Sequence, residues 1–185
     1  MGYWNTRGLR GSTFEEMINL TNETYRTKGL AIIQKVPTPI TPVRLNKSTR
    51  TIEVAYFEKK STVDYIGAVQ GIPVAFDVKE TTQKNLPLQN IHEHQIDFMR
   101  DFVRQEGVAF ILVRFAVVDK VFLLPFQELY EFWERAQEGG RKSIPLDAFD
   151  EKLVAVGKSG AMVHYLEPLS TFLQKRNIKS SDSRV

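Results

Sequence analysis

Two acidic residues stand in or beside apolar runs that have the pattern of neighbouring strands. The runs 63–69 and 72–79 are separated only by Gln70 and Gly71, which predicts a hairpin with a two-residue loop. That loop length places Asp64 directly opposite Asp77. Like charges in such a pair are destabilising, so a divalent cation between the two carboxylates is the simplest explanation for the pair. Mg²⁺ accepts sites built from one or two carboxylates and water.

A lysine follows the second acid on the same face of the strand. Because side chains alternate along a strand, Lys79 lies one step from Asp77 on that face. A metal beside a lysine can activate water and offset the charge on a phosphate under attack. The same acid–lysine spacing recurs at residues 58–60 and 150–152, but neither follows an apolar run with a facing acid. A surface salt bridge between the acid and the lysine remains the alternative.

Two polar features in the predicted helix 90–105 could also take part in a site. Gln95 interrupts an apolar stripe, which indicates either a side chain directed at a site or one at the margin of the stripe. His92 and His94 could pair as metal ligands, but residues two apart on a helix do not face each other. A metal role for the histidines is therefore the weaker hypothesis.

The composition fits one globular domain. The chain has 185 residues, of which 42% are hydrophobic, so a substantial core can form. It has no cysteine, which excludes disulfides, thiolate metal sites and thiol nucleophiles. The first residues lack the apolar core of a signal peptide, and charged residues and a proline interrupt the most apolar stretch, 108–126. We expect no membrane association.

Positive charge is concentrated near the start of the chain. The net charge is only +3, but residues 24–52 contain no acid while six Lys and Arg residues fall inside them. Arg7 and Arg10 add two more before the first acid. Such clustering favours a polyanion, with nucleic acid as the main class, over the alternative of a solvated basic face.

The remaining pattern predicts an α+β fold, a mixed sheet flanked by helices. Helices are expected over 13–29, 90–105, 126–137 and 167–173, the first capped by Thr13 and Gly29. Strands are expected over 30–36, 43–45, 51–57, 63–69, 72–79, 108–118, 121–124 and 152–156. The prolines at 37, 39 and 42 suit no sheet interior, so that stretch should protrude. We expect one domain over 1–170 and a polar, mobile tail over 171–185.

Several long strings resemble the RecU family of bacterial Holliday junction resolvases. They are residues 2–15, 60–67, 76–80, 86–95, 140–145 and 164–167. The resemblance implies an α/β restriction-endonuclease-like fold that works as a homodimer. It also implies an Mg²⁺-dependent endonuclease, with Mn²⁺ as a substitute, that resolves four-way DNA junctions by paired symmetric nicks in recombination and DNA repair.

The resemblance also assigns roles to individual residues. It implies a catalytic set consisting of Asp64, Asp77, Lys79, Glu15 and Gln95. Within that set the two aspartates bind the metal, Lys79 is the catalytic lysine and Glu15 is a supporting acid. Thr62 and Gln95 would complete the metal site.

A stalk over residues 37–51 is the further feature that the resemblance implies. Such a stalk enters the open centre of the junction, with Arg44, Lys47 and Arg50 as phosphate contacts. Family members also act with the branch-migration motor and the strand-exchange recombinase, in the bacterial cytoplasm at the nucleoid. Two other functions stay open. One is a nuclease that cuts duplex DNA at a sequence, and the other is a non-catalytic junction-binding or recombinase-modulating architectural protein.

Overall fold

The computed structural model describes residues 9–37, 39–57 and 62–182. Its centre is a six-stranded sheet in the order β1-β4-β5-β7-β8-β10. β5 and β7 run parallel and every other neighbouring pair is antiparallel, so the predicted mixed sheet is confirmed. The strands are β1 (Ile32–Lys35), β4 (Tyr65–Val69), β5 (Ile72–Thr81), β7 (Val108–Phe115), β8 (Lys120–Pro125) and β10 (Val154–Ala155).

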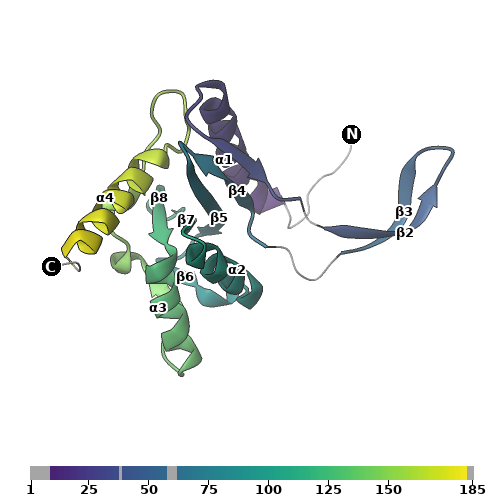
Figure 1. The fold of residues 1–185 in the computed structure, drawn as a ribbon. Helices are drawn as coiled ribbons and strands as arrows, with labels where there is room; N and C mark the ends of the chain where they lie inside the picture. The colour runs from purple at the N-terminus through teal and green to yellow at the C-terminus, as the bar shows by residue number, and fades with distance from the viewer. Residues whose placement is uncertain (1–8, 38, 58–61, 183–185) are drawn as a thin grey trace.

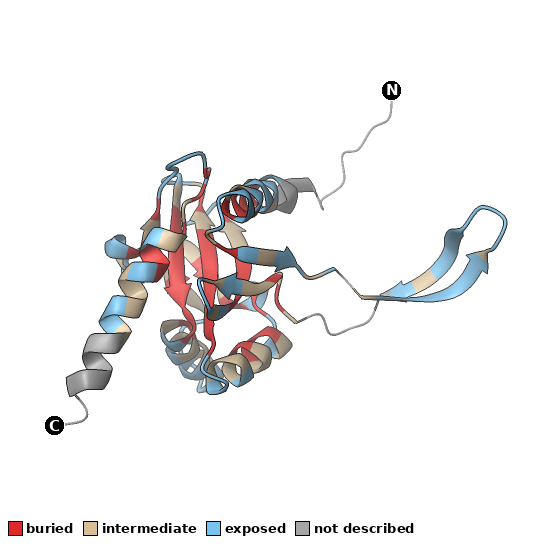
Figure 2. Cartoon of the chain, turned by 45° about the horizontal axis from the view of Figure 1, so that its top comes forward, coloured by how far each residue is buried: buried red, intermediate tan, exposed pale blue. Residues whose placement is uncertain are grey.

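Helices cover both faces of this sheet, which makes three layers (Figure 1). α1 (Leu9–Thr27) and α4 (Leu166–Asp182) pack on one face, and α2 (Glu93–Arg104) and α3 (Phe126–Gln137) on the other. The alternation of side chains along β5 accounts for both contacts. Val74 and Phe76 enter the α1–α4 core, while Ala75 enters the α2–α3 core. Figure 2 shows the buried residues concentrated in the sheet and on the inner sides of the helices.

A second, two-stranded sheet extends away from this body. β2 (Ile40–Asn46) and β3 (Thr51–Phe57) form a hairpin with no helix against it, and its residues are largely exposed (Figures 1 and 2). The predicted protrusion is therefore confirmed. Pro42 lies inside β2, which pairs with β3. Among the described residues, the other edge of β2 has no partner strand, so the N–H that proline lacks is not needed for a hydrogen bond on that edge.

Several element boundaries differ from those expected. α1 begins at Leu9, so Thr13 lies inside the helix instead of capping it, whereas Gly29 has the positive φ of +66° expected at the end of a helix. α2 begins only at Glu93, because a 3₁₀ turn over Leu88–Asn90 precedes it. Two short strands, β6 (Asn85–Pro87) and β9 (Ser143–Pro145), pair with each other and were not predicted.

The last helix is also longer than expected. α4 continues to Asp182, through residues that the composition assigned to a tail from 171 onward. Phe172 and Leu173 explain the start of this extension, because both are partly buried against the α1–α4 core. Further 3₁₀ turns over Leu146–Ala148 and Glu151–Leu153 lead into β10. Across the described part of the chain, no helix is both long enough and apolar enough to cross a membrane.

Candidate active site

The β4–β5 hairpin brings the two predicted acids together. Its register pairs Val69 with Ile72, so the loop has the predicted two residues. Gln70 and Gly71 both have positive φ, +47° and +86°, as a type I′ hairpin turn requires. Asp64 immediately precedes β4, and its main-chain N–H donates to Oδ1 of Asp77 over 3.1 Å. The predicted juxtaposition is confirmed.

A second hydrogen bond fixes the Asp64 side chain. The main-chain N–H of Val78 donates to Oδ2 of Asp64 over 3.0 Å. Asp77 thus accepts the N–H of Asp64 itself, and Asp64 accepts the N–H of the residue that follows Asp77. Asp77 is fully buried, and Asp64 is partly buried. The backbone of two paired strands, not flexible side-chain geometry, therefore sets the spacing of the two carboxylates.

Lys79 completes an ion pair with the buried acid. Its Nζ lies 2.5 Å from Oδ2 of Asp77, and the lysine side chain is 17% exposed while the aspartate is 0% exposed. The alternative of a surface salt bridge therefore does not describe this pair. The lysine side chain is therefore the more accessible member of the pair.

Gln95 points into the same cluster. Its Nε2 donates to Oδ2 of Asp77 over 2.8 Å, and its Oε1 accepts the main-chain N–H of His92 over 3.0 Å. The second bond caps the start of α2, in the manner of a capping box. Gln95 is 7% exposed, so it is directed at a site and does not lie at the margin of the helix. His92 precedes the helix, and its ring stacks on that of His94 with centroids 5.4 Å apart.

The electrostatics of the pair favour a bound cation. Burial, together with the hydrogen bond and charge of Asp77, raises the pKa of Asp64 to about 7, while Lys79 and the Val78 N–H act in the opposite direction. When Asp64 is ionised, the two carboxylates and one ammonium group carry a net negative charge, which a bound cation would offset. No cluster of three or more Asp, Glu, His or Cys side chains with metal-site geometry occurs within the described residues. The donor set fits Mg²⁺, which keeps several waters when one or two carboxylates hold it.

The structure gives less direct support for the predicted roles of Glu15 and Thr62. The carboxylate of Glu15 forms an ion pair with Lys35 on β1. The main-chain oxygen of Glu15 accepts from the hydroxyl of Tyr65, the neighbour of Asp64, over 3.4 Å. Thr62 is half-buried two residues before Asp64, and among the described residues its hydroxyl has no hydrogen-bond partner. Both roles stay predictions.

Sequence reasoning missed the contacts that hold the site against its surroundings. Tyr65 is fully buried, and its hydroxyl donates to Oδ1 of Asn19 on α1 over 2.8 Å. The main-chain N–H of Val36 donates to the carbonyl oxygen of Asp64 over 2.8 Å, immediately before the chain leaves for the β2–β3 hairpin. In the sequence, the only signal for these contacts is the tyrosine next to Asp64. A hydrogen bond between main-chain groups does not depend on residue type, so the sequence does not reveal it.

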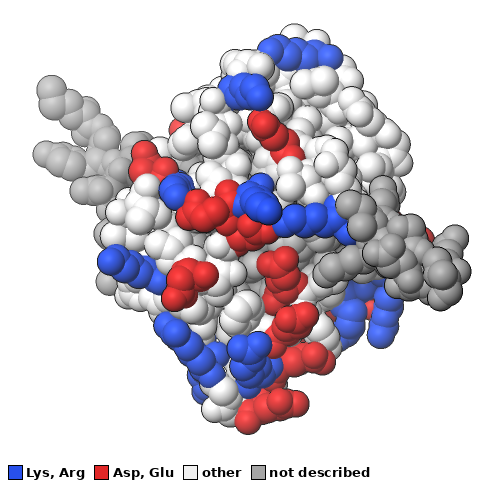
Figure 3. Space-filling view, turned by 90° about the vertical axis from the view of Figure 1, so that its left-hand side faces the viewer, with Lys and Arg blue, Asp and Glu red and all other residues white. Residues whose placement is uncertain are grey.

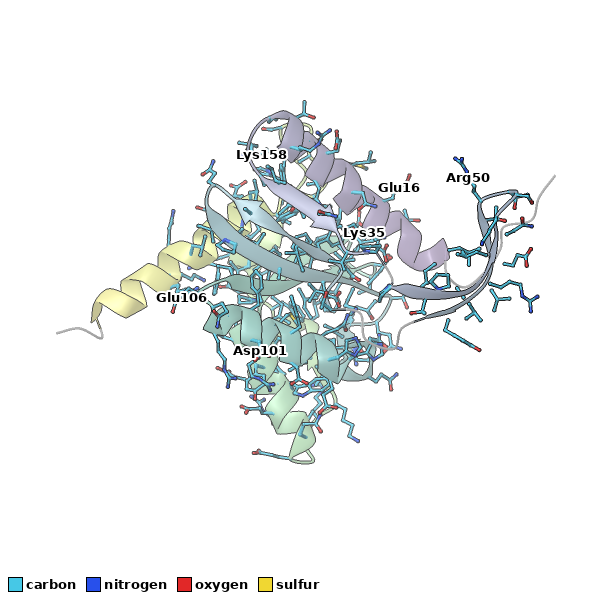
Figure 4. All side chains as sticks on the ribbon, turned by 45° about the vertical axis from the view of Figure 1, so that its right-hand side comes forward. Glu16, Lys35, Arg50, Asp101, Glu106 and Lys158 are labelled. Atoms are coloured by element: carbon cyan, nitrogen blue, oxygen red, sulfur yellow. The ribbon has the colours of Figure 1, made fainter. Side chains whose placement is uncertain are left out.

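The basic residues of the hairpin lie apart from the acids. Figure 4 shows Lys35 near α1 and Arg50 at the far end of the hairpin. Arg44, Lys47 and Arg50 are exposed, and within the described residues none of them forms an ion pair. On the flank shown in Figure 3, basic and acidic side chains are interspersed, so that flank presents no continuous basic surface. Arg7 and the side chain of Arg10 lie outside the described residues.

Comparison with known proteins finds relatives that share one name. The Holliday junction resolvase RecU of Pediococcus pentosaceus is 44% identical over 149 residues, 78% of this chain and 74% of that protein. The protein of the same name from Geobacillus sp. is 46% identical over 142 residues, 75% of this chain and 71% of that protein. The structure of Archaeoglobus fulgidus Hjc, a Holliday junction resolvase, is 12% identical over 60% of this chain and 77% of that one. Its TM-score against this chain is 0.37. The model of the family "RecU: Recombination protein U" matches residues 9–171, and this chain belongs to that family.

Proposed function

We propose that this protein is an Mg²⁺-dependent endonuclease that resolves four-way DNA junctions by paired symmetric nicks in recombination and DNA repair. The observation that supports this most directly is the buried Asp77, with Asp64, Lys79 and Gln95 all within hydrogen-bonding range of it. Relatives that are 44% and 46% identical to the chain over 149 and 142 aligned residues are named Holliday junction resolvases. A restriction-endonuclease-like fold, with acids and a lysine on adjacent strands, is part of the proposal.

In this proposal Asp64 and Asp77 would hold the cation, with Thr62 and Gln95 at its margin. A bound Mg²⁺ ion would supply Lewis acidity and lower the pKa of a bound water. Lys79, held in place by Asp77, is the more accessible side chain of that pair. It can donate a hydrogen bond to a phosphate oxygen and offset the charge that develops on phosphorus in the transition state. Glu15 is a supporting acid, available once its pairing with Lys35 is given up.

A homodimer accounts for the exposed apolar hairpin. Six large apolar side chains of β2 and β3 are between 40% and 68% exposed: Ile40, Val43, Leu45, Ile52, Val54 and Tyr56. A two-stranded hairpin alone is at best marginally stable in water, so cover from a second copy would stabilise it. Two copies would also supply the two active sites that symmetric nicks require.

The proposal extends to the DNA contacts and the cellular context. Arg44, Lys47 and Arg50 on the stalk, with Arg7 and Arg10 near the start of the chain, would neutralise junction phosphates. Partnership with the branch-migration motor and the strand-exchange recombinase stays a prediction. So does a cytoplasmic, nucleoid-associated location.

Cleavage of a mobile four-way junction with and without Mg²⁺ tests the proposal. The wild-type protein should give paired symmetric nicks only with Mg²⁺, and Asp77→Asn should give none while still binding the junction. Asp101→Asn is the matched control, because Asp101 is exposed on the outer side of α2 (Figure 4). Equal cutting of linear duplex of the same sequence would favour a sequence-specific nuclease. Junction binding without nicks in any divalent metal would favour the architectural alternative.

A further inference from the structure

A cavity of about 660 Å³ lies on the α2–α3 side of the sheet, outside the acid cluster. Part of its lining is apolar and includes Leu88 and Ile91, which are 3% and 2% exposed. Trp133 on α3, which is half-buried, forms part of one wall. The volume lies in the range of cavities that take small organic ligands.

The polar lining of this cavity consists mainly of side-chain amides. Four carboxamides line it, those of Gln83, Asn85, Gln89 and Gln137. Within the described chain, none of these four carboxamide groups donates or accepts a hydrogen bond. Asn and Gln amides can pair with the donor and acceptor edge of a base, and an aromatic ring offers it a stacking surface. The combination is suited to a flat heterocycle with several polar edge atoms.

The charge of the lining favours a ligand that carries phosphate. No acidic residue lines the cavity, and Lys142 contributes a positive charge. Trp133 also lines a smaller cavity of about 270 Å³, whose lining is net negative because Arg100 is outnumbered by four acids: Glu93, Asp97, Glu134 and Glu138. A polyanion is repelled from the second cavity and admitted to the first.

Two segments connect the cavity to the acid cluster. Along β5, Thr81 lies on the face that carries Asp77, and its hydroxyl accepts the main-chain N–H of Gln83 over 3.1 Å. Thr81 is four positions along the strand from Asp77, which is about 13 Å, and the cavity lining begins beyond it, at Gln83. Along the other segment, Ile91 precedes His92, whose N–H bonds to the Gln95 side chain that contacts Asp77.

We propose that this cavity binds an unstacked nucleobase of the cleaved strand, at least about four nucleotides from the cut phosphate. Gln83 and Gln89 would read the edge of the base, and Trp133 would stack on its face. This inference rests on the proposed nuclease function. The acid cluster is proposed to act on the phosphate and not on a base. The cavity would add a subsite that recognises a base near the cut phosphate.

Cleavage of a pool of junctions randomised around the cut phosphate tests the reading step. The wild-type protein should prefer particular bases at one position, at least about four nucleotides from the cut. Gln83→Ala with Gln89→Ala should reduce that preference roughly tenfold. Gln127→Ala, an exposed glutamine at the other end of α3, should leave the preference unchanged. If the double variant selects the same bases as the wild type, the pocket does not read sequence.

Tryptophan fluorescence in EDTA tests the same cavity without cleavage. The chain has two tryptophans, so Trp4→Phe leaves Trp133 as the only emitter. Stacking of a base should quench this emission when junction DNA binds, and the Gln83→Ala and Gln89→Ala changes should weaken the quenching. Binding without quenching would overturn the proposal even if the protein cleaves junctions. Equal quenching by free deoxynucleoside monophosphates would also overturn it, in favour of a free-nucleotide site.

Discussion

The side-chain amide nitrogen of Gln95 lies 2.8 Å from the carboxylate of Asp77, and the two residues come from different layers of the fold. Asp77 is in the central sheet and Gln95 is in the first turn of α2. Because the amide oxygen of Gln95 also accepts the N–H of His92, one side chain both caps the helix and stabilises a buried charge. Loss of the amide should therefore affect the helix and the acid together.

Gln95→Leu should lower the free energy of unfolding of the metal-free protein by about 1–3 kcal/mol. The change leaves a buried carboxylate with one donor fewer and leaves the first turn of α2 uncapped. Urea unfolding in EDTA measures the effect, and Gln127→Leu, on the exposed start of α3, is the control. Gln95→Glu keeps an acceptor for His92 but removes the donor to Asp77. If it were as stable as the wild type, the contact with Asp77 would contribute nothing.

The stability of the metal-free protein should fall as pH rises from about 4 to about 7. The pKa of Asp64 is raised in the folded protein, so the folded state holds its proton at pH values where the unfolded chain has released it. The contribution is fully present below the ordinary carboxyl pKa and is lost as pH passes through the raised value. A shift of about three units sets a ceiling of about 4 kcal/mol.

Chemical denaturation of the wild type and of Asp64→Asn in EDTA, at pH 5 and pH 8, measures this loss. The asparagine can still accept the N–H of Val78, so the variant should lose less stability over that range. Added Mg²⁺ should stabilise the wild type at pH 8 more than it stabilises the variant. Parallel pH profiles for the two proteins would show that Asp64 does not titrate in this window.

Lys79→Met should reduce single-turnover cleavage of a junction by about 10²–10³-fold, the range for loss of one preorganised charged donor. Junction binding should change little, because one ammonium group is a small part of the total phosphate contact. Lys152→Met is the matched control, since Lys152 has the same acid–lysine spacing but is exposed within the 3₁₀ turn Glu151–Leu153. A loss of binding that equalled the loss of rate would place Lys79 in DNA binding alone.

The acid pair could be predicted because its geometry depends on local sequence. A two-residue loop with Gly71 at its second position fixes the register of β4 and β5, and the register fixes which residues face each other. The same reasoning gave α3 its observed bounds, since the helix follows Pro125 and ends before two glycines. Such features need only a few neighbouring residues.

The parts that could not be predicted depend on residues far apart in the chain. β6 and β9 have three residues each, both end in proline, and Leu86 pairs with Ile144. Strands that short have no alternation to detect. The role of Gln95 was ambiguous for a similar reason, because whether it lies at the stripe margin or in a site depends on how α2 packs on β5. The end of α4 was missed because its polar residues resemble a solvated tail.

Removal of charge from the hairpin should flatten the salt dependence of junction binding. Each phosphate contact contributes about 0.9 to the slope of log K against log salt, so Arg44→Ala with Lys47→Ala should reduce the slope by about two. Arg50→Gly should reduce it further at little structural cost, because Arg50 has a φ of +55°, which glycine adopts more readily. Fluorescence anisotropy with a labelled junction in EDTA measures these slopes.

The control for the salt slope is Lys120→Ala, because Lys120 forms an ion pair with Glu151 on the body of the protein. It should leave the slope unchanged. Asp77→Asn should also leave it unchanged, since Asp77 lies in β5 and not on the hairpin. If the hairpin variants keep the wild-type slope while losing affinity, the hairpin contributes through its exposed apolar side chains and not through phosphate contacts. The basic residues would then have no role in the proposed DNA interface.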